Sequence, residues 1–258
     1  ALMDADRLDA YRFEAGETAE TSGEPPWDAW SANLETKLAS FSQTSPIAQL
    51  RAAISAECLR HAQEGCGAGL YRLCVPTGGG KTFSAMRYAL AVAKLQGMRR
   101  IVYAAPYKAI LEQTAAELRA ALGHEEQILE HHSDVTFAKE DENGNRDLGQ
   151  EAEALKRYQT LSERWDSPMV LTTTVQLLNT LFAGNSASVR RFCALAGSVI
   201  ILDEAQCVPI RCWYLLMNAI RYLTGVCGCA VVLCTATQPP WENLPDYPLP
   251  VPTALIAD

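Results

Sequence analysis

The chain has 258 residues, with 22 Lys and Arg against 30 Asp and Glu, which gives a formal net charge of −8. Hydrophobic residues make up 48% and charged residues 20%, a composition typical of a globular protein with its own core. This excludes disorder of the whole chain, because disordered chains have too few apolar residues to fold. No apolar stretch approaches the ~20 residues of a membrane-spanning helix, so we expect no membrane partner.

The acidic balance argues against a nucleic-acid footprint spread over the whole surface. The excess of acidic residues is largest at 125–153, where there are ten acidic residues and only Lys139 and Arg146 as strong bases. Any nucleic acid must therefore be bound through local contacts. Nine cysteines are scattered without paired spacing, which favours reduced thiols and a cytoplasmic setting over a disulfide framework.

Hydrophobic periodicity and the positions of glycine and proline predict alternating helices and strands. The predicted helices span residues 27–41, 46–64, 81–96, 107–122, 148–165, 172–182 and 211–224. The predicted strands span residues 70–75, 100–104, 127–131, 168–171, 198–202 and 229–234, with the last of these as the final strand. This order indicates βαβ crossovers, and strands that are apolar throughout indicate a sheet covered on both faces. We expect an α/β fold with a parallel sheet between two helical layers.

The strongest functional signal is the segment Val75-Pro-Thr-Gly-Gly-Gly-Lys-Thr82, between a predicted strand and a predicted helix. Its glycines let the backbone approach a phosphate group closely. Lys81 would neutralise the β- and γ-phosphates of ATP, and the Thr82 hydroxyl would hold Mg²⁺. The strict Walker pattern begins with glycine where this chain has valine, so Thr77 and Gly78 must form the turn. A chance glycine-rich turn is the alternative, which the strand–loop–helix setting disfavours.

The second signal is Asp203-Glu-Ala-Gln206, directly after the predicted strand at 198–202. Open α/β sheets bind ligands at the carboxyl ends of their strands. There Asp203 can hold Mg²⁺, and Glu204 can orient and polarise the attacking water. The alternative is two acids that cap a helix. The phosphate loop favours catalysis, because phosphoryl transfer needs both motifs.

These segments together resemble a known family. Residues 76–82, 203–206 and 235–237 look like motifs I, II and III of a superfamily 2 helicase. The segments at 103–113, 130–133, 172–176, 198–206 and 235–239 resemble the CRISPR-associated helicase–nuclease of type I interference systems. The resemblance extends over about residues 49–239. It implies a RecA-like P-loop NTPase domain, the first of the two RecA-like domains in that family.

The resemblance implies a role for each matching residue. Nucleotide binding falls to Thr77, Gly78, Gly79, Gly80, Lys81 and Thr82, with Gln49 where an adenine-reading glutamine could lie. The resemblance assigns catalysis to Lys81, Asp203 and Glu204, and metal binding to Thr82 and Asp203. Coupling of the nucleotide state to domain movement falls to Gln206, Thr235 and Thr237. The single-strand backbone is assigned to motif Ia and Ib residues Pro106, Tyr107, Lys108, Gln113, Thr172, Thr173, Thr174 and Gln176.

For several of these residues a purely structural role is the alternative. Thr172, Thr173 and Thr174 could simply cap a helix. Gln49 could merely face solvent. His131 and His132 could suggest a metal site, but neighbouring residues of a strand point to opposite faces, so we favour a structural or loop role for them.

The resemblance also divides the chain into three parts. Residues 1–45 would be the tail of a preceding HD nuclease-like domain with a connecting segment, where Asp6, or else Asp4, matches the last metal-binding aspartate. Residues 46–238 would be the helicase domain. Residues 239–258 are rich in proline and would be a linker toward a second RecA-like domain. Since the arginines that stabilise the γ-phosphate come from that second domain, we expect weak ATP binding and slow hydrolysis, or none, from this chain alone.

The function implied is an ATP- and Mg²⁺-dependent motor that translocates on single-stranded DNA and unwinds target DNA for degradation. The implied partners are single-stranded DNA, a crRNA-guided surveillance complex, and the second RecA-like domain and HD nuclease domain of the parent protein. One alternative is another superfamily 2 motor, which remodels RNA or serves restriction. The other is an ATP-gated protein-interaction switch to which nucleic acid does not matter.

Overall fold

The computed structural model describes residues 24–132, 158, 161–237 and 250–256. Asp4, Asp6, the acidic segment at 133–157 and most of the proline-rich segment therefore lie outside the described residues. Residues 161–164 are helical and fit the predicted helix at 148–165, of which the greater part also lies outside.

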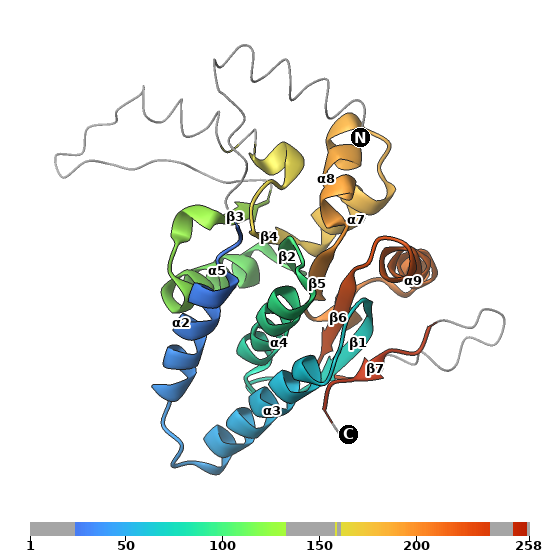
Figure 1. Cartoon of the computed structure of the whole chain (residues 1–258). Coiled ribbons are helices and arrows are strands. Elements are labelled where there is room, and N and C mark those ends of the chain that lie inside the picture. Colours follow the sequence, from blue (N-terminus) through green and yellow to red (C-terminus); the bar gives the residue numbers. More distant parts are fainter. Residues whose placement is uncertain (1–23, 133–157, 159–160, 238–249, 257–258) are drawn as a thin grey trace.

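A parallel sheet with the strand order β3-β4-β2-β5-β6-β1-β7 forms the centre of the molecule (Figure 1). The strands are β1 Gly69–Cys74, β2 Arg100–Ala105, β3 Ile128–His131, β4 Met169–Thr173, β5 Ser198–Leu202, β6 Ala230–Thr235 and β7 Thr253–Ala254. The expected α/β fold with a parallel sheet is confirmed.

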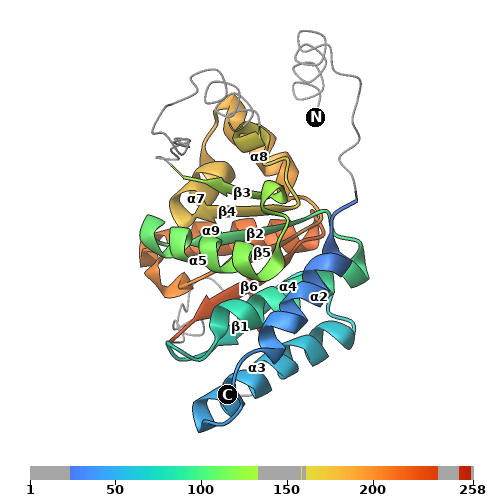
Figure 2. The same cartoon turned by 90° about the vertical axis from the view of Figure 1, so that its left-hand side faces the viewer.

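Helices cover both faces of the sheet, as Figures 1 and 2 show from two directions. One layer contains α2 Trp27–Ala39, α3 Pro46–Gln63, α4 Lys81–Gln96 and α5 Lys108–Leu122. The other contains α7 Thr174–Phe182, α8 Ser186–Leu195 and α9 Ile210–Gly225. Short 3₁₀ turns, η1 Glu125–Gln127 and η2 Ala205–Cys207, follow α5 and β5.

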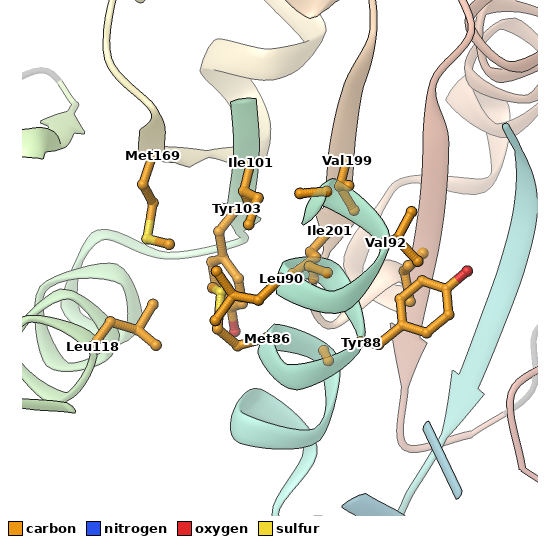
Figure 3. Close-up of a cluster of buried hydrophobic side chains, with 14 of the residues drawn as sticks. Met86, Tyr88, Leu90, Val92, Ile101, Tyr103, Leu118, Met169, Val199 and Ile201 are labelled. Carbon is orange, nitrogen blue, oxygen red and sulfur yellow. The ribbon is translucent and has the colours of Figure 1, made fainter. Parts of the chain in front are cut away.

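The alternation of side chains along each strand explains why the strands are apolar throughout. In β2, Ile101 and Tyr103 pack into the core formed with α4 and α5, where Figure 3 shows them beside Leu90. Val102 and Ala104 pack into the core on the opposite face. Both faces are buried, so neither set of positions is polar.

Helix α2 packs against the core of the sheet, although it precedes the predicted start of the helicase domain at residue 46. Its residues Trp27, Trp30 and Leu34 are buried in the core that contains α4 and α5. The Trp27 indole donates to the Met98 carbonyl at 3.0 Å. The division of the chain at residue 46 stays a prediction, and the packing of α2 is a long-range contact that the local sequence does not indicate.

Two further elements were not predicted. Helix α8 begins at the N-cap residue Asn185, whose side chain accepts a hydrogen bond from the Ser188 amide at 2.8 Å. This is a recognisable start signal that the sequence analysis did not use. Strand β7 pairs with β1, and the neighbouring Leu255 is fully buried. The strand at 229–234 is therefore not the final one, and the end of the proposed linker is part of the sheet.

In the part of the chain that the structure describes, no helix is both long and apolar enough to cross a membrane.

Candidate functional site

A tight turn joins β1 to α4 in the glycine-rich segment. The Gly79 amide donates to the Pro76 carbonyl at 3.0 Å, and Gly78 has a φ of +81° in the left-handed region. A Cβ on Gly79 would lie 2.3 Å from Cγ1 of Val75, so a side chain does not fit there. The turn predicted at Thr77 and Gly78 is confirmed, and the bare backbone is left free to approach a ligand.

The first turn of α4 presents unpaired backbone donors. Gly80 is the N-cap residue with a φ of +79°, and no side chain of the described residues caps the helix. Lys81 and Thr82 follow in the first turn, Lys81 buried and Thr82 half-buried. The N-terminus of a helix of 16 residues attracts anions through its free N–H groups and its dipole.

Helix α3 contacts this loop through Arg51, a residue that no sequence motif indicated. The Arg51 Nε donates to the Gly78 carbonyl at 2.6 Å, and a Cβ on Gly80 would lie 3.2 Å from Cγ of Arg51. Gln49 lies two residues earlier on the same helix, is exposed, and donates to the Gln43 carbonyl at 3.2 Å. Its role as an adenine reader stays a prediction.

The Lys81 ammonium group meets both acids of the second motif. It contacts the Glu204 carboxylate directly and lies 3.6 Å from the Asp203 Oδ1. Burial works against the charged form, but the hydrogen bond to Glu204 and the charge of Asp203 raise the pKa of Lys81 above its usual value. The ammonium group therefore stays protonated and pairs with both acids.

Each of the two acids accepts a further hydrogen bond, one from a distant residue and one from a near neighbour in the sequence. The Tyr103 hydroxyl on β2 donates to the Asp203 Oδ2 at 2.6 Å, a contact that no motif predicted. Glu204 has a left-handed φ of +47°, and its Oε2 accepts from the Gln206 Nε2 at 2.5 Å. Burial raises the pKa of Glu204, but the hydrogen bonds from Lys81 and Gln206 outweigh it and lower the pKa below its usual value.

This donor set fits a nucleotide with a magnesium ion. Asp203 and Glu204 supply carboxylate oxygens and Thr82 a hydroxyl oxygen, the ligand type that Mg²⁺ prefers. Lys81 and the uncapped start of α4 supply the positive charge for phosphates.

The predicted coupling residues lie next to this site. Strand β6 lies between β5 and β1 in the sheet. At its end the backbone carbonyl of the buried Thr235 accepts a hydrogen bond from the Val75 amide at 3.0 Å. Thr237, two residues further, is exposed. The ends of three neighbouring strands therefore bring Gln206 and Thr235 beside the phosphate loop.

The predicted motif Ia and Ib residues lie together at the ends of β2 and β4. The pairing of Ala105 with Thr173 aligns the two strand ends. Tyr107 is 61% exposed and is the N-cap residue of α5, whose first turn is capped by no side chain in the described part of the chain. Lys108 lies 3.7 Å from Glu112, and Gln113 donates to Glu117 at 3.0 Å.

The three threonines of motif Ib differ in their surroundings. Thr172 is fully buried and donates to the His131 carbonyl at 3.0 Å, which does not fit a direct contact with DNA. The Thr173 hydroxyl accepts from the Gln176 amide at 3.3 Å, so this threonine does cap a helix. Thr174 is buried, and its hydroxyl has no hydrogen-bond partner among the described residues.

The two histidines occupy different environments. His131 packs its ring edge-on against Trp165, with the ring centroids 5.9 Å apart, in keeping with a structural role. The His132 Nε2 lies 3.0 Å from Glu130 and 3.9 Å from Glu112, and this set has the spacing of a metal site. Each carboxylate already has a cationic partner, Arg119 for Glu130 and Lys108 for Glu112, and we assign no metal there.

Comparison with known proteins agrees with this site. The sequence matches the DEAD/DEAH box helicase family over residues 52–244. The fold and the phosphate loop thus define an ATP-binding helicase domain, and the chain belongs to the DEAD/DEAH box helicase family. The sequence and the fold are also similar to those of CRISPR-associated Cas3 proteins.

The chain is 33% identical over 178 residues to the CRISPR-associated nuclease/helicase Cas3 of Haloferax volcanii. This alignment covers 65% of this chain and 19% of that protein. Crystal structures of T. fusca Cas3 with AMPPNP and with ADP align with a TM-score of 0.60 at 22% and 23% identity, and each alignment covers 82% of this chain and 24% of that chain. The chain thus spans about a fifth of the length of its curated relative.

Proposed function

We propose that this chain is the nucleotide-binding motor domain of a helicase that uses ATP to translocate on single-stranded DNA, within a type I CRISPR helicase–nuclease that unwinds target DNA for degradation. The observation that carries the proposal is the placement of two sites at one edge of the sheet. The phosphate loop and the paired acids lie at the ends of β1 and β5. The starts of α5 and α7 lie at the neighbouring ends of β2 and β4.

ATP hydrolysis would use the residues around Lys81. The phosphates would lie against residues 78–82, and Thr82 and Asp203 would hold Mg²⁺, which neutralises charge on the phosphates when bound. The Lys81 ammonium group would leave the Glu204 carboxylate and bind the β- and γ-phosphates instead. Glu204, released but still held by Gln206, would then accept a proton from the attacking water. Thr235 and Thr237 would pass the nucleotide state on to a second domain.

The DNA backbone would run across the starts of α5 and α7. Uncapped N–H groups at the start of α5 and the side chains of Lys108 and Gln176 suit phosphate oxygens. Contacts of this kind read no sequence, which suits a motor that must pass over any DNA. The named relative is a CRISPR-associated nuclease/helicase, so we propose a crRNA-guided complex and a nuclease domain as partners.

The test is the ATPase activity of the natural full-length protein with single-stranded DNA, with RNA of matched sequence, and with neither. We expect strong stimulation by DNA alone and its loss in Lys81→Ala. Lys94→Ala is the matched control, because Lys94 is exposed on the same helix and pairs with Asp28. Stimulation by RNA would indicate a different superfamily 2 motor, and equal rates in all three conditions would indicate an ATP-gated switch.

A further inference from the structure

Arg191 on α8 is a buried cation that contacts a histidine, a glutamine and an aromatic ring. It is 9% exposed, and no described carboxylate lies within ion-pair distance of its guanidinium group. Its Nη1 lies 3.2 Å from the His131 Nε2 and 3.5 Å from the Gln176 Oε1, and its Nε donates to the Ala187 carbonyl at 3.3 Å. The guanidinium carbon lies 5.9 Å from the centre of the Trp165 ring. Among the described residues its hydrogen-bond partners are neutral and Glu163 acts only as a more distant charge, and burying a cation in this way is costly.

The contact with His131 fixes the direction of the guanidinium group. Burial and the positive charge of Arg191 lower the pKa of His131 to about 4. The imidazole is therefore neutral at physiological pH, and its Nε2 can accept a hydrogen bond from Arg191. Together with the Trp165 ring, this holds the Nη1 group in one place, facing Gln176.

The contact with Gln176 fixes the orientation of that side-chain amide. The Oε1 faces the guanidinium group, so the NH₂ group of the same amide points away from it. The backbone amide of Gln176 is already bonded to Thr173. The side-chain NH₂ group is thus the donor that this half-buried residue can offer to a ligand at the start of α7.

The orientation decides whether Gln176 attracts or repels a phosphate group. An NH₂ group donates hydrogen bonds to phosphate oxygens. In a flipped amide, the carbonyl oxygen with its partial negative charge would face the phosphate and be repelled by it. We propose that Arg191 is a positioning residue, which holds the Gln176 amide with its NH₂ group toward a phosphate of the DNA backbone. This inference rests on the proposed function, because it takes DNA as the ligand of motif Ib.

The test is a double-mutant cycle on the natural full-length protein, with labelled oligothymidylate as the probe. We expect Arg191→Met and Gln176→Ala each to weaken DNA binding about tenfold, the loss of one charge-assisted hydrogen bond. The double variant should bind no more weakly than either single variant, because Arg191 acts only through Gln176. In Arg191→Met the KM for ATP and the turnover at saturating DNA should keep their wild-type values, which a general loss of structure would not allow.

Arg190→Met is the matched control. Arg190 is the neighbouring residue on α8, and it pairs with Glu163 at 2.8 Å. We expect its DNA affinity to equal that of the wild type. Losses that multiply in the double variant, or an unchanged affinity in Arg191→Met, would overturn the proposal.

Gln176→Glu keeps the test decisive even where Arg191→Met does not fold. A glutamate gives Arg191 a counter-charge but has no NH₂ group to offer to phosphate. We expect a higher midpoint of thermal unfolding together with an affinity for DNA as weak as that of Gln176→Ala. Wild-type affinity in this variant would overturn the inference. Failure of the proposed function would look different, because the wild type itself would then show no ATPase stimulation by DNA.

Discussion

The ammonium group of Lys81, at the start of α4, contacts the carboxylate of Glu204, which follows β5 and lies 123 residues further along the chain. In this arrangement Lys81, the proposed phosphate-binding cation, and Glu204, the proposed catalytic carboxylate, form an ion pair with each other. A nucleotide must therefore displace one from the other before hydrolysis can begin. This competition between an internal carboxylate and the phosphates leads to the first two predictions.

We expect Glu204→Gln to separate binding from catalysis. The neutral side chain attracts Lys81 less, so a non-hydrolysable ATP analogue should bind at least as tightly as in the wild type. Turnover should fall about 10²-fold or more, because the proposed general base is lost. Fluorescent-nucleotide titration and steady-state ATPase assays measure the two effects. Weaker nucleotide binding would contradict the competition. Glu57→Gln, on the exposed surface of α3, serves as the control.

The same ion pair should make stability depend on pH in a defined direction. The pKa of Glu204 is lowered in the folded protein from 4.5, so the pair contributes fully above that value. Its contribution is lost as the pH falls through the lowered pKa. Lys81 stays protonated throughout, since its pKa is raised. We expect the difference in unfolding free energy between wild type and Glu204→Gln to shrink on acidification. A difference independent of pH would exclude the ion pair as its cause.

The hydroxyl of Tyr103 should matter for the metal-binding acid. Its removal in Tyr103→Phe leaves a buried oxygen of Asp203 without its donor, at a cost of about 1–3 kcal/mol in unfolding free energy. We also expect a higher KM for magnesium–ATP, because Asp203 loses its orientation. Tyr71→Phe is the matched control, since that hydroxyl donates to the Gly67 carbonyl away from the site. Its KM should not change, and equal KM values in both variants would contradict the orienting role.

Helix α2 should contribute to the stability of the domain. Trp30 is fully buried, so Trp30→Ala should lower the unfolding free energy by about 3–5 kcal/mol. Leu95→Ala, at a position that is 55% exposed on α4, should change it little. Chemical denaturation of both variants measures the difference. A loss below about 1 kcal/mol for Trp30→Ala would mean that α2 is only a connecting segment.

The end of the chain offers a similar comparison. Leu255 is fully buried beside β7, whereas Val251 is 72% exposed. We expect Leu255→Ala to cost about 2–5 kcal/mol and Val251→Ala to cost little. Equal unfolding free energies for the two variants would show that β7 does not stabilise the sheet.

The sequence by itself determined the order of most helices and strands and the place of the phosphate loop. These features are local: the apolar run of β5 needs only burial on both faces, and the turn at Gly78 needs only glycine. The grouping of Lys81 with Asp203 also followed, because carboxyl ends of parallel strands meet at one edge.

Only the tertiary structure decided which distant groups touch. The hydroxyl of Tyr103 reaches Asp203 across 100 residues of sequence, and Arg51 reaches the phosphate loop from a different helix. The docking of α2 and β7 and the burial of Arg191 depend likewise on packing between elements. Such contacts leave no periodic pattern in the sequence, because they depend on helix docking and sheet order rather than on neighbouring residues.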